Sequence, residues 1–187
     1  NENVNLTAIT DRSEFITKHF IDSLCGASFD EFKTAKSVID VGTGAGFPGL
    51  PLAIVSPEKD FVLIDSLNKR IKILDEIIEE LGLKNVTALH GRAEDLARAP
   101  HFRQKFDVCV SRAVSRLSVL SEYCLPFIKR GGHLIAYKGP DAENEITDAA
   151  NAIKRLGGQV SSVSETDMKN YDLYHKIVFV KKVSDTP

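Results

Sequence analysis

Short hydrophobic runs alternate with amphipathic stretches along most of this chain. Five runs have the length and composition of buried strands: residues 38–41, 61–65, 85–90, 107–111 and 133–137. Stretches with apolar positions at three- and four-residue spacing predict helices: residues 11–24, 50–55, 67–81, 117–129 with an interruption near Pro126, and 142–156. A loop-like joint at residues 25–35 separates the first helix from the first strand, and two strand-like runs, 160–163 and 174–180, follow the last helix.

The helix at 67–81 has the clearest pattern. Its apolar residues Ile71 and Leu74 begin a repeat that continues to Leu81. Ser66 is expected to cap its start, and Gly82 is expected to end it.

Alternating strands and helices of this kind predict an α/β fold with a doubly wound, mostly parallel sheet. The two late runs have no helix between them, which suits an antiparallel hairpin at one edge and makes a seven-stranded sheet. We expect residues 1–35 to form a short N-terminal helical appendage, truncated at its start, and residues 36–187 to form a nucleotide-binding domain.

Composition narrows the class of protein. The 187 residues are 43% hydrophobic, which suits one domain with a sizeable core, and the net charge of −2 argues against coating nucleic acid by bulk charge. No apolar run approaches membrane-spanning length, and three widely spaced cysteines fit a reducing cytoplasm. Since the chain begins at Asn1 rather than Met, we expect a fragment, which leaves open a leader peptide upstream.

The stretch "VIDVGTGAGFPGLPL" (38–52) joins a strand to three glycines at every second position, Gly42, Gly44 and Gly46. A dinucleotide-binding turn has two residues before its last glycine, and a P-loop ends in Gly-Lys-Ser/Thr; neither pattern is present here. The loop therefore favours an adenosyl compound over a pyrophosphate.

Acids at strand ends refine this prediction. Asp65 closes the second strand, where a carboxylate can accept from both ribose hydroxyls of NAD or S-adenosylmethionine. Asp40 suits the cofactor's amino-acid end, or equally braces the glycine loop. Ala93 and Glu94 follow the third strand and could read an adenine edge. The missing pyrophosphate signature and the late strand pair favour S-adenosylmethionine.

Several motifs resemble one family. They are "NLTAIT" (5–10), "KHFIDSL" (18–24), "DVGTGAGFPGLPL" (40–52), "DSLNKR" (65–70), "RAED" (92–95), "SRAVSRL" (111–117) and "AYKG" (136–139). In this order and spacing they resemble the bacterial 16S ribosomal RNA guanine-N7 methyltransferases, also called glucose-inhibited division protein B, over nearly the whole chain. Family members normally carry more helix before 5–10, and many have a basic tail after the last strand.

The resemblance implies an S-adenosylmethionine fold acting on 16S ribosomal RNA. It places cofactor contacts on Gly42, on Phe47, on the pair Ala93 and Glu94 and on Arg112, and Asp65 matches the family's acid at the end of the second strand. We also expect Gly44, in the same loop, to contact the cofactor.

The residues agree with attack by guanine N7, which carries a lone pair and needs no general base. Methylation of a cytosine carbon needs a thiolate, and the one candidate, Cys124, lies in a buried helical pattern. Methylation of an exocyclic amine is typical of an Asn/Asp-Pro-Pro-aromatic motif, where this chain has "SRAV" (111–114). We expect Arg112 to act by positioning and charge, with a structural ion pair to Asp40 or Glu94 as the alternative.

Substrate contacts are predicted at two further residues. His19 shares a helical face with Asp22 and Ser23; this face could line the RNA side of the pocket or form a hydrogen-bonded joint between appendage and core. Lys138 ends the fifth strand and could contact an RNA phosphate or remain solvated. Basic pairs could add to an RNA face: 69–70, 112 with 116, 129–130 and 181–182.

The leading hypothesis is a cytoplasmic methyltransferase that modifies 16S ribosomal RNA within a small subunit, whole or partly assembled. We expect no metal and a monomer. Open alternatives are a small-molecule or protein methyltransferase on the same fold, a non-catalytic cofactor-binding assembly factor, and, least favoured, an NAD-linked oxidoreductase.

Overall fold

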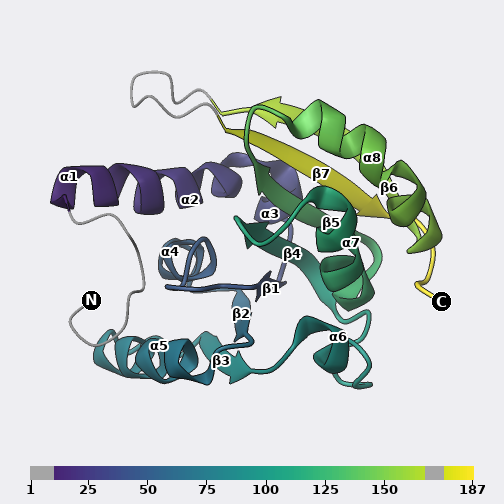
Figure 1. Ribbon diagram of the computed structural model, residues 1–187. Coiled ribbons are helices and arrows are strands. Elements are labelled where there is room, and N and C mark those ends of the chain that lie inside the picture. Colours follow the sequence, from purple (N-terminus) through teal and green to yellow (C-terminus); the bar gives the residue numbers. More distant parts are fainter. Residues whose placement is uncertain (1–10, 167–174) are drawn as a thin grey trace.

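Figure 1 presents a computed structural model of the chain, which describes residues 11–166 and 175–187. Seven strands form one sheet in the order β3-β2-β1-β4-β5-β7-β6. Strands β1 to β5 pair in parallel, while β7 runs antiparallel to both of its neighbours, β5 and β6. The doubly wound sheet with a late antiparallel hairpin is confirmed. The motif at 5–10 and the predicted strand residue Tyr174 lie outside the described residues.

The strands follow the predicted runs closely. Their bounds are Ser37–Val41 (β1), Asp60–Asp65 (β2), Val86–His90 (β3), Phe106–Arg112 (β4), Ile128–Lys138 (β5), Gly158–Glu165 (β6) and Lys176–Lys182 (β7). The α-helices are Arg12–Phe15 (α1), Asp22–Leu24 (α2), Asp30–Lys33 (α3), Gly49–Val55 (α4), Asn68–Glu80 (α5), Ala93–Leu96 (α6), Leu117–Cys124 (α7) and Ala142–Arg155 (α8). A π-helical turn, Ile16–Ile21, joins α1 to α2, and 3₁₀ turns span Cys25–Ser28 and Leu125–Phe127.

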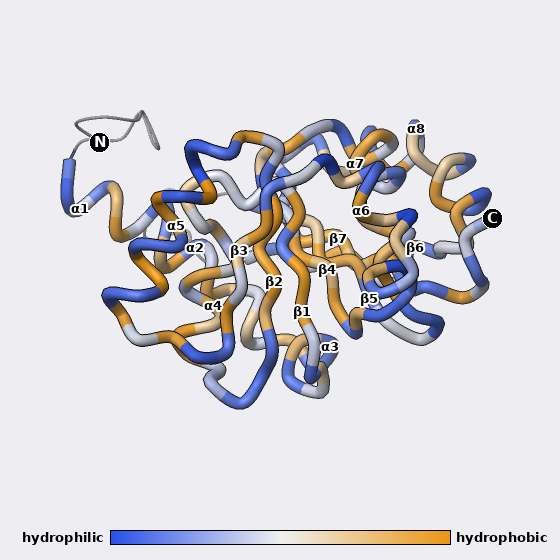
Figure 2. Tube along the Cα trace, turned by 90° about the horizontal axis from the view of Figure 1, so that it is seen from below, coloured by the Kyte–Doolittle hydropathy of each residue, from blue (hydrophilic) through white to orange (hydrophobic). Residues whose placement is uncertain are grey.

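Helices cover both faces of the sheet and create two cores. On one face α3, α4 and α5 pack against the strands around Phe32, Phe61 and Leu63, which are almost fully buried. On the other face α7 and α8 enclose Ile39 and Phe127. Figure 2 shows the hydrophobic colour concentrated along the central strands, as expected for strands buried on both faces.

Three local predictions were wrong. The helix expected at 117–129 ends at Cys124, and residues from Ile128 belong to β5, because Pro126 cannot donate the backbone hydrogen bond that would continue the helix. Ser66 makes no cap on α5; instead Asp65 Oδ1 accepts from the Leu67 N–H at 2.8 Å. The joint at 25–35 contains a 3₁₀ turn and α3 rather than a plain loop.

Parallel pairing brings the functional candidates to one edge of the sheet. Asp40 pairs in register with Val110 of β4, and Asp65 pairs with His90 of β3, so the carboxyl ends of β1 to β4 meet there. Ligands of open α/β sheets bind at this edge. Within the described residues, no helix has the length and apolar character needed to cross a membrane.

Candidate functional site

The glycine loop turns sharply as it leaves β1. Gly42, Gly44 and Gly46 have φ values of 73°, 59° and 94°, a region that side chains other than glycine rarely adopt. A Cβ on Gly42 would also lie 2.5 Å from Val114 Cγ2. The alternating glycines therefore fulfil two needs, a left-handed backbone and close approach to the loop that follows β4.

Two carboxylates brace this loop from beneath. Asp40 Oδ2 accepts from Thr43 Oγ1 at 2.7 Å and from the Gly49 N–H at 2.8 Å, which supports the bracing role that the sequence left open for this residue. Asp65 Oδ2 accepts from the Gly44 N–H at 3.0 Å. The acids thus determine where the loop's backbone lies.

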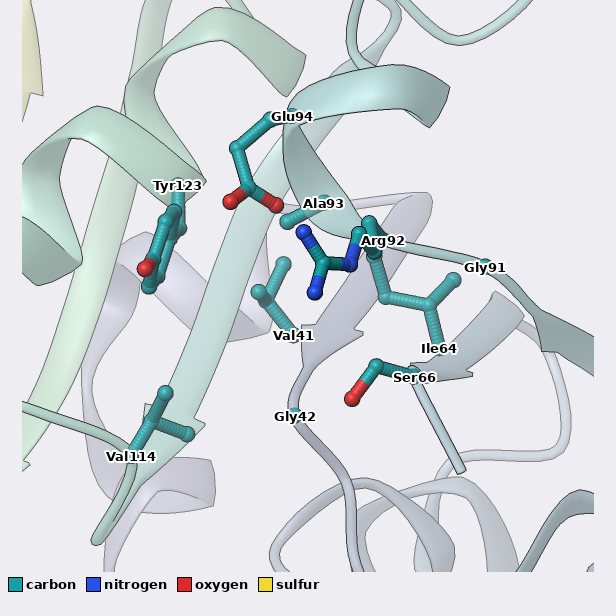
Figure 3. A pocket seen from close by; sticks show the side chains of 10 residues that line it. All are labelled: Val41, Gly42, Ile64, Ser66, Gly91, Arg92, Ala93, Glu94, Val114 and Tyr123. Atoms are coloured by element: carbon teal, nitrogen blue, oxygen red, sulfur yellow. The ribbon is translucent and has the colours of Figure 1, made fainter. Parts of the chain in front are cut away.

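A cavity of about 280 Å³ opens above the ends of β1, β2 and β3. Figure 3 shows Glu94 and Tyr123 facing one another across it, with the Arg92 guanidinium between the Glu94 side and Ser66. The residues in its wall are Val41, Gly42, Ile64, Ser66, Gly91, Arg92, Ala93, Glu94, Val114 and Tyr123. We refer to this space as the first cavity.

The first cavity fits the adenosyl cofactor that the sequence predicts. Three predicted contacts, Gly42, Ala93 and Glu94, lie together in its wall. Asp40 Oδ1 is buried without a hydrogen-bond partner among the described residues, and burial raises the pKa of this carboxyl group to about 6 against the hydrogen bonds from Thr43 and Gly49. Asp40 does not line the cavity, but an unpartnered carboxylate oxygen beneath the loop suits a cofactor that carries an ammonium group.

Other predicted cofactor contacts lie outside this wall. Asp65 and Gly44 are bonded to each other, and Phe47 stacks on His19 with ring centroids 4.8 Å apart. The Arg112 guanidinium lies over the Phe47 ring, 5.5 Å from its centroid. Direct contact of these residues with the cofactor stays a prediction.

Arg112 belongs to a buried polar cluster that the sequence did not reveal. Its Nη1 lies 2.6 Å from Asp22 Oδ2, and its Nη2 lies 3.3 Å from His19 Nδ1. The alternative ion pairs of Arg112 with Asp40 or Glu94 were therefore wrong, since the partner comes from the N-terminal segment. Asp22 Oδ1 also lies 2.7 Å from His175 Nδ1.

Electrostatics at this cluster follow from the contacts. Burial raises the pKa of Asp22, but the hydrogen bond and charge of His175 together with Arg112 outweigh it and hold that pKa below its ordinary value. Burial and the nearby Arg112 lower the pKa of His19. At neutral pH we therefore expect a charged Asp22 and a neutral His19.

A second cavity of about 290 Å³ lies against this cluster. Its wall consists of Lys18, His19, Asp22, Arg112, Ala113, Tyr137, Lys138, Gly139 and His175. Both substrate candidates, His19 and Lys138, are therefore brought together here. Lys138 is not a solvated lysine: its side chain is 9% exposed, and its Nζ lies 2.7 Å from Glu145 Oε2.

The joint between the N-terminal segment and the sheet is confirmed. Tyr137 Oη donates to the Ser23 carbonyl at 2.6 Å and accepts from the Gly26 N–H at 3.1 Å. Ser23 also donates from Oγ to the His19 carbonyl. The face shared by His19, Asp22 and Ser23 is thus a hydrogen-bonded joint, and two of its members also line the second cavity.

Lys182 does not belong to an RNA face. It is fully buried, and its Nζ donates to the Leu125 and Leu156 carbonyls at 2.8 and 2.9 Å. The prediction that the pair 181–182 adds to such a face was wrong for this residue.

The site residues that the sequence missed are Arg92, Tyr123, Asp22 as a partner of Arg112, and His175. The sequence did hold a signal for Arg92: it belongs to the "RAED" motif and directly precedes the predicted adenine contacts. Tyr123 and His175 had no such signal: Tyr123 lies near the end of α7, and His175 is 153 positions from its partner Asp22.

Comparison with known proteins gives a consistent result. The family model described as rRNA small subunit methyltransferase G matches residues 1–174. The chain is 54% identical over 187 residues to Ribosomal RNA small subunit methyltransferase G of Clostridium botulinum (strain Eklund 17B / Type B), covering all of this chain and 78% of that protein. Its identity to the Clostridium perfringens (strain 13 / Type A) protein of the same name is 51%, with the same coverage.

Solved structures agree on the fold. A SAM dependent methyltransferase from Aquifex aeolicus matches with a TM-score of 0.62 and 24% identity, over 94% of this chain and 100% of that one. M. jannaschii TYW2 in complex with AdoMet matches with a TM-score of 0.67 and 17% identity, over 94% of this chain and 80% of that one. At these identities the likeness establishes the fold alone.

Proposed function

The chain belongs to the rRNA small subunit methyltransferase G family, and from this membership we propose that it methylates N7 of one guanine in 16S ribosomal RNA. S-adenosylmethionine is its cofactor. One observation carries the proposal: the first cavity, which suits an adenosyl group, adjoins the second cavity across residues 112–114, with Val114 in one wall and Arg112 and Ala113 in the other.

The chemistry asks little of the protein. S-adenosylmethionine supplies an electrophilic methyl group on a sulfonium, and guanine N7 has a lone pair and no proton to lose. Since no general base is needed, the protein's side chains act by holding the guanine in line with the methyl group. Arg112 is suited to this, because Asp22 and His19 hold its guanidinium in one place.

Each residue then has a defined task. Glu94 and the Ala93 backbone hold the adenine, Gly42 allows the cofactor to approach the backbone, and Asp40 attracts its amino-acid end. Asp65 orients the glycine loop through its hydrogen bond from the Gly44 N–H. We propose that the substrate is the small ribosomal subunit in the cytoplasm, because a near-neutral protein gains little affinity for RNA from net charge.

The test uses the purified protein with isotopically labelled S-adenosylmethionine and small ribosomal subunits that lack the modification. We expect labelled N7-methylguanosine when the 16S RNA is digested to nucleosides and separated by mass spectrometry. Label on another nucleoside, or on ribosomal protein alone, would contradict the proposal.

A matched pair of variants separates cofactor binding from general damage. Glu94 lines the first cavity, whereas the next residue, Asp95, is an exposed acid of the same helix and does not line it. Glu94→Gln should weaken S-adenosylmethionine binding about ten-fold in calorimetry, through loss of a hydrogen bond to a charged acceptor. Asp95→Asn should bind like the unaltered protein; equal losses in both would refute the role of Glu94.

A further inference from the structure

We propose that the second cavity is the binding pocket for the target guanine, taken out of the RNA stack, and that Asp22 is the positioning residue that holds Arg112 in its wall. This inference rests on the proposed function and specifies where its substrate binds. Enzymes that modify a base within structured nucleic acid extrude it into a pocket.

The size of the cavity suits a single base. Its volume of about 290 Å³ lies just below the range of about 300–1,000 Å³ typical of ligand pockets, as expected for a ligand the size of one base. Two residues of its wall, Ala113 and Gly139, are small, so they leave room beside them for a planar ring.

Charge argues for a neutral base rather than a phosphate. Among the described residues, each lysine and arginine in the wall is paired with a carboxylate: Arg112 with Asp22, Lys138 with Glu145, and Lys18 with Glu14. Lys138 Nζ also donates to the Ser115 carbonyl at 2.9 Å. A phosphate would have to displace these carboxylates, whereas a neutral base need not.

The ion pairs in the wall also suit the product, N7-methylguanine, which carries a positive charge. As the N7 lone pair forms a bond to the methyl carbon, the carbon–sulfur bond breaks and its electron pair remains on sulfur; the base becomes a cation and no proton moves. A wall with unpaired cations would oppose this charge. Asp22 and Glu145 compensate the charges of Arg112 and Lys138, so these two cations oppose the new charge less than unpaired ones would.

Asp22 is positioned to hold this arrangement together. It is 0% exposed, and its two carboxylate oxygens contact side chains from different elements, Arg112 at the end of β4 and His175 just before β7. A buried carboxylate shared in this way fixes both partners, because moving either leaves a buried charge without compensation. Asp22 acts through Arg112.

Gly139 offers a direct way to fill the pocket. It lines the cavity, has no positive φ, and a Cβ placed on it would meet no atom within 4 Å. The fold therefore accepts a larger residue there. Gly139→Leu should lower kcat on undermethylated small subunits about 100-fold, the cost of misplacing a reacting group by about 1 Å. Gly139→Ala should cause a smaller loss.

Controls separate this effect from misfolding. Glu80→Leu adds the same side chain at an exposed site at the end of α5 remote from both cavities, and it should leave kcat unchanged. S-adenosylmethionine affinity in calorimetry should stay the same in Gly139→Leu, because the first cavity does not include this residue. Asp22→Asn should lower kcat, whereas Asp148→Asn, which breaks the exposed pair with Arg116, should not.

The outcomes are distinguishable. If the unaltered protein makes no N7-methylguanosine, the proposed function fails. If it does so and Gly139→Leu retains full kcat, the pocket assignment is overturned. If Gly139→Leu instead raises KM for the subunit, keeps kcat, and flattens the salt dependence of subunit binding, the cavity takes a phosphate and our assignment is again overturned.

Discussion

Replacing Tyr137 by Phe tests the joint between the N-terminal segment and the sheet. The tyrosine ring is 4% exposed, and its hydroxyl is the only part that phenylalanine lacks. That hydroxyl donates to the Ser23 carbonyl at 2.6 Å and accepts from the Gly26 N–H at 3.1 Å. The change therefore removes two hydrogen bonds and no hydrophobic area.

The expected cost follows from what the hydroxyl leaves behind. A buried donor or acceptor that loses its partner costs about 1–3 kcal/mol. The Ser23 carbonyl and the Gly26 N–H would both lose this partner, and both residues are buried. We therefore expect Tyr137→Phe to lower the free energy of unfolding by about 2–4 kcal/mol.

Urea titration of the unaltered protein and the variant measures this cost. A second change gives a sharper check: a Cβ on Gly26 would lie 2.1 Å from Tyr137 Oη, so Gly26→Ala should be severe alone and milder with Tyr137→Phe. The double variant should then lose less stability than the sum of the single changes. A cost below about 0.5 kcal/mol for Tyr137→Phe, or strict additivity, would refute the reasoning.

Three further predictions concern single groups. Asp65→Asn should weaken S-adenosylmethionine binding about ten- to hundred-fold in calorimetry, since it removes charged hydrogen bonds of about 1.5–3 kcal/mol that hold Gly44 and Leu67; unchanged affinity would contradict the bracing role. Burial alone would raise the pKa of the Asp107 carboxyl group, but hydrogen bonds from Lys129, Lys36 and Ser37 outweigh it and lower that pKa to about 2. The folded-state pKa lies below the unfolded value, so the stability lost in Asp107→Asn should be full above about pH 4 and should shrink towards pH 2 in acid titrations of unfolding. Burial raises the pKa of the Cys25 thiol to about 11 and holds that of Cys109 well above its ordinary value, and Cys124 is fully buried, so iodoacetamide at pH 7.5 should label the folded protein far more slowly than the urea-unfolded chain.

Most of the fold could be predicted from the sequence because its strands are buried on both faces. Runs such as 61–64 are continuously apolar, and the helix at 67–81 repeats at three and four, so tertiary contacts reinforce the local preference. The prediction failed where a locally helical pattern of residues lies in a strand of the sheet. Residues 128–129 continue a helical pattern, yet they belong to β5 because Pro126 ends the helix.

The site divides in the same way. Gly42, Ala93 and Glu94 were predictable, because they follow strands whose order along the chain determines which edge they share. The Asp22 cluster was not predictable, since it depends on a helix that lies across the sheet and on His175, which is 153 positions away in sequence. The spacing of apolar residues along a chain predicts helices and strands, but it does not predict a contact between two distant polar side chains.

The two cavities therefore depend on different parts of the structure. The first is built by loops that directly follow β1, β2, β3 and β4, so the sheet itself supports it. The second needs the N-terminal segment for Lys18, His19 and Asp22, and that segment is tied to the sheet by Tyr137 and by Arg112. Loosening this segment should therefore impair placement of the base while the adenosyl group still binds. In Tyr137→Phe, a fall in kcat with unchanged S-adenosylmethionine affinity would show this separation, and a parallel loss of both would show that the cavities depend on one another.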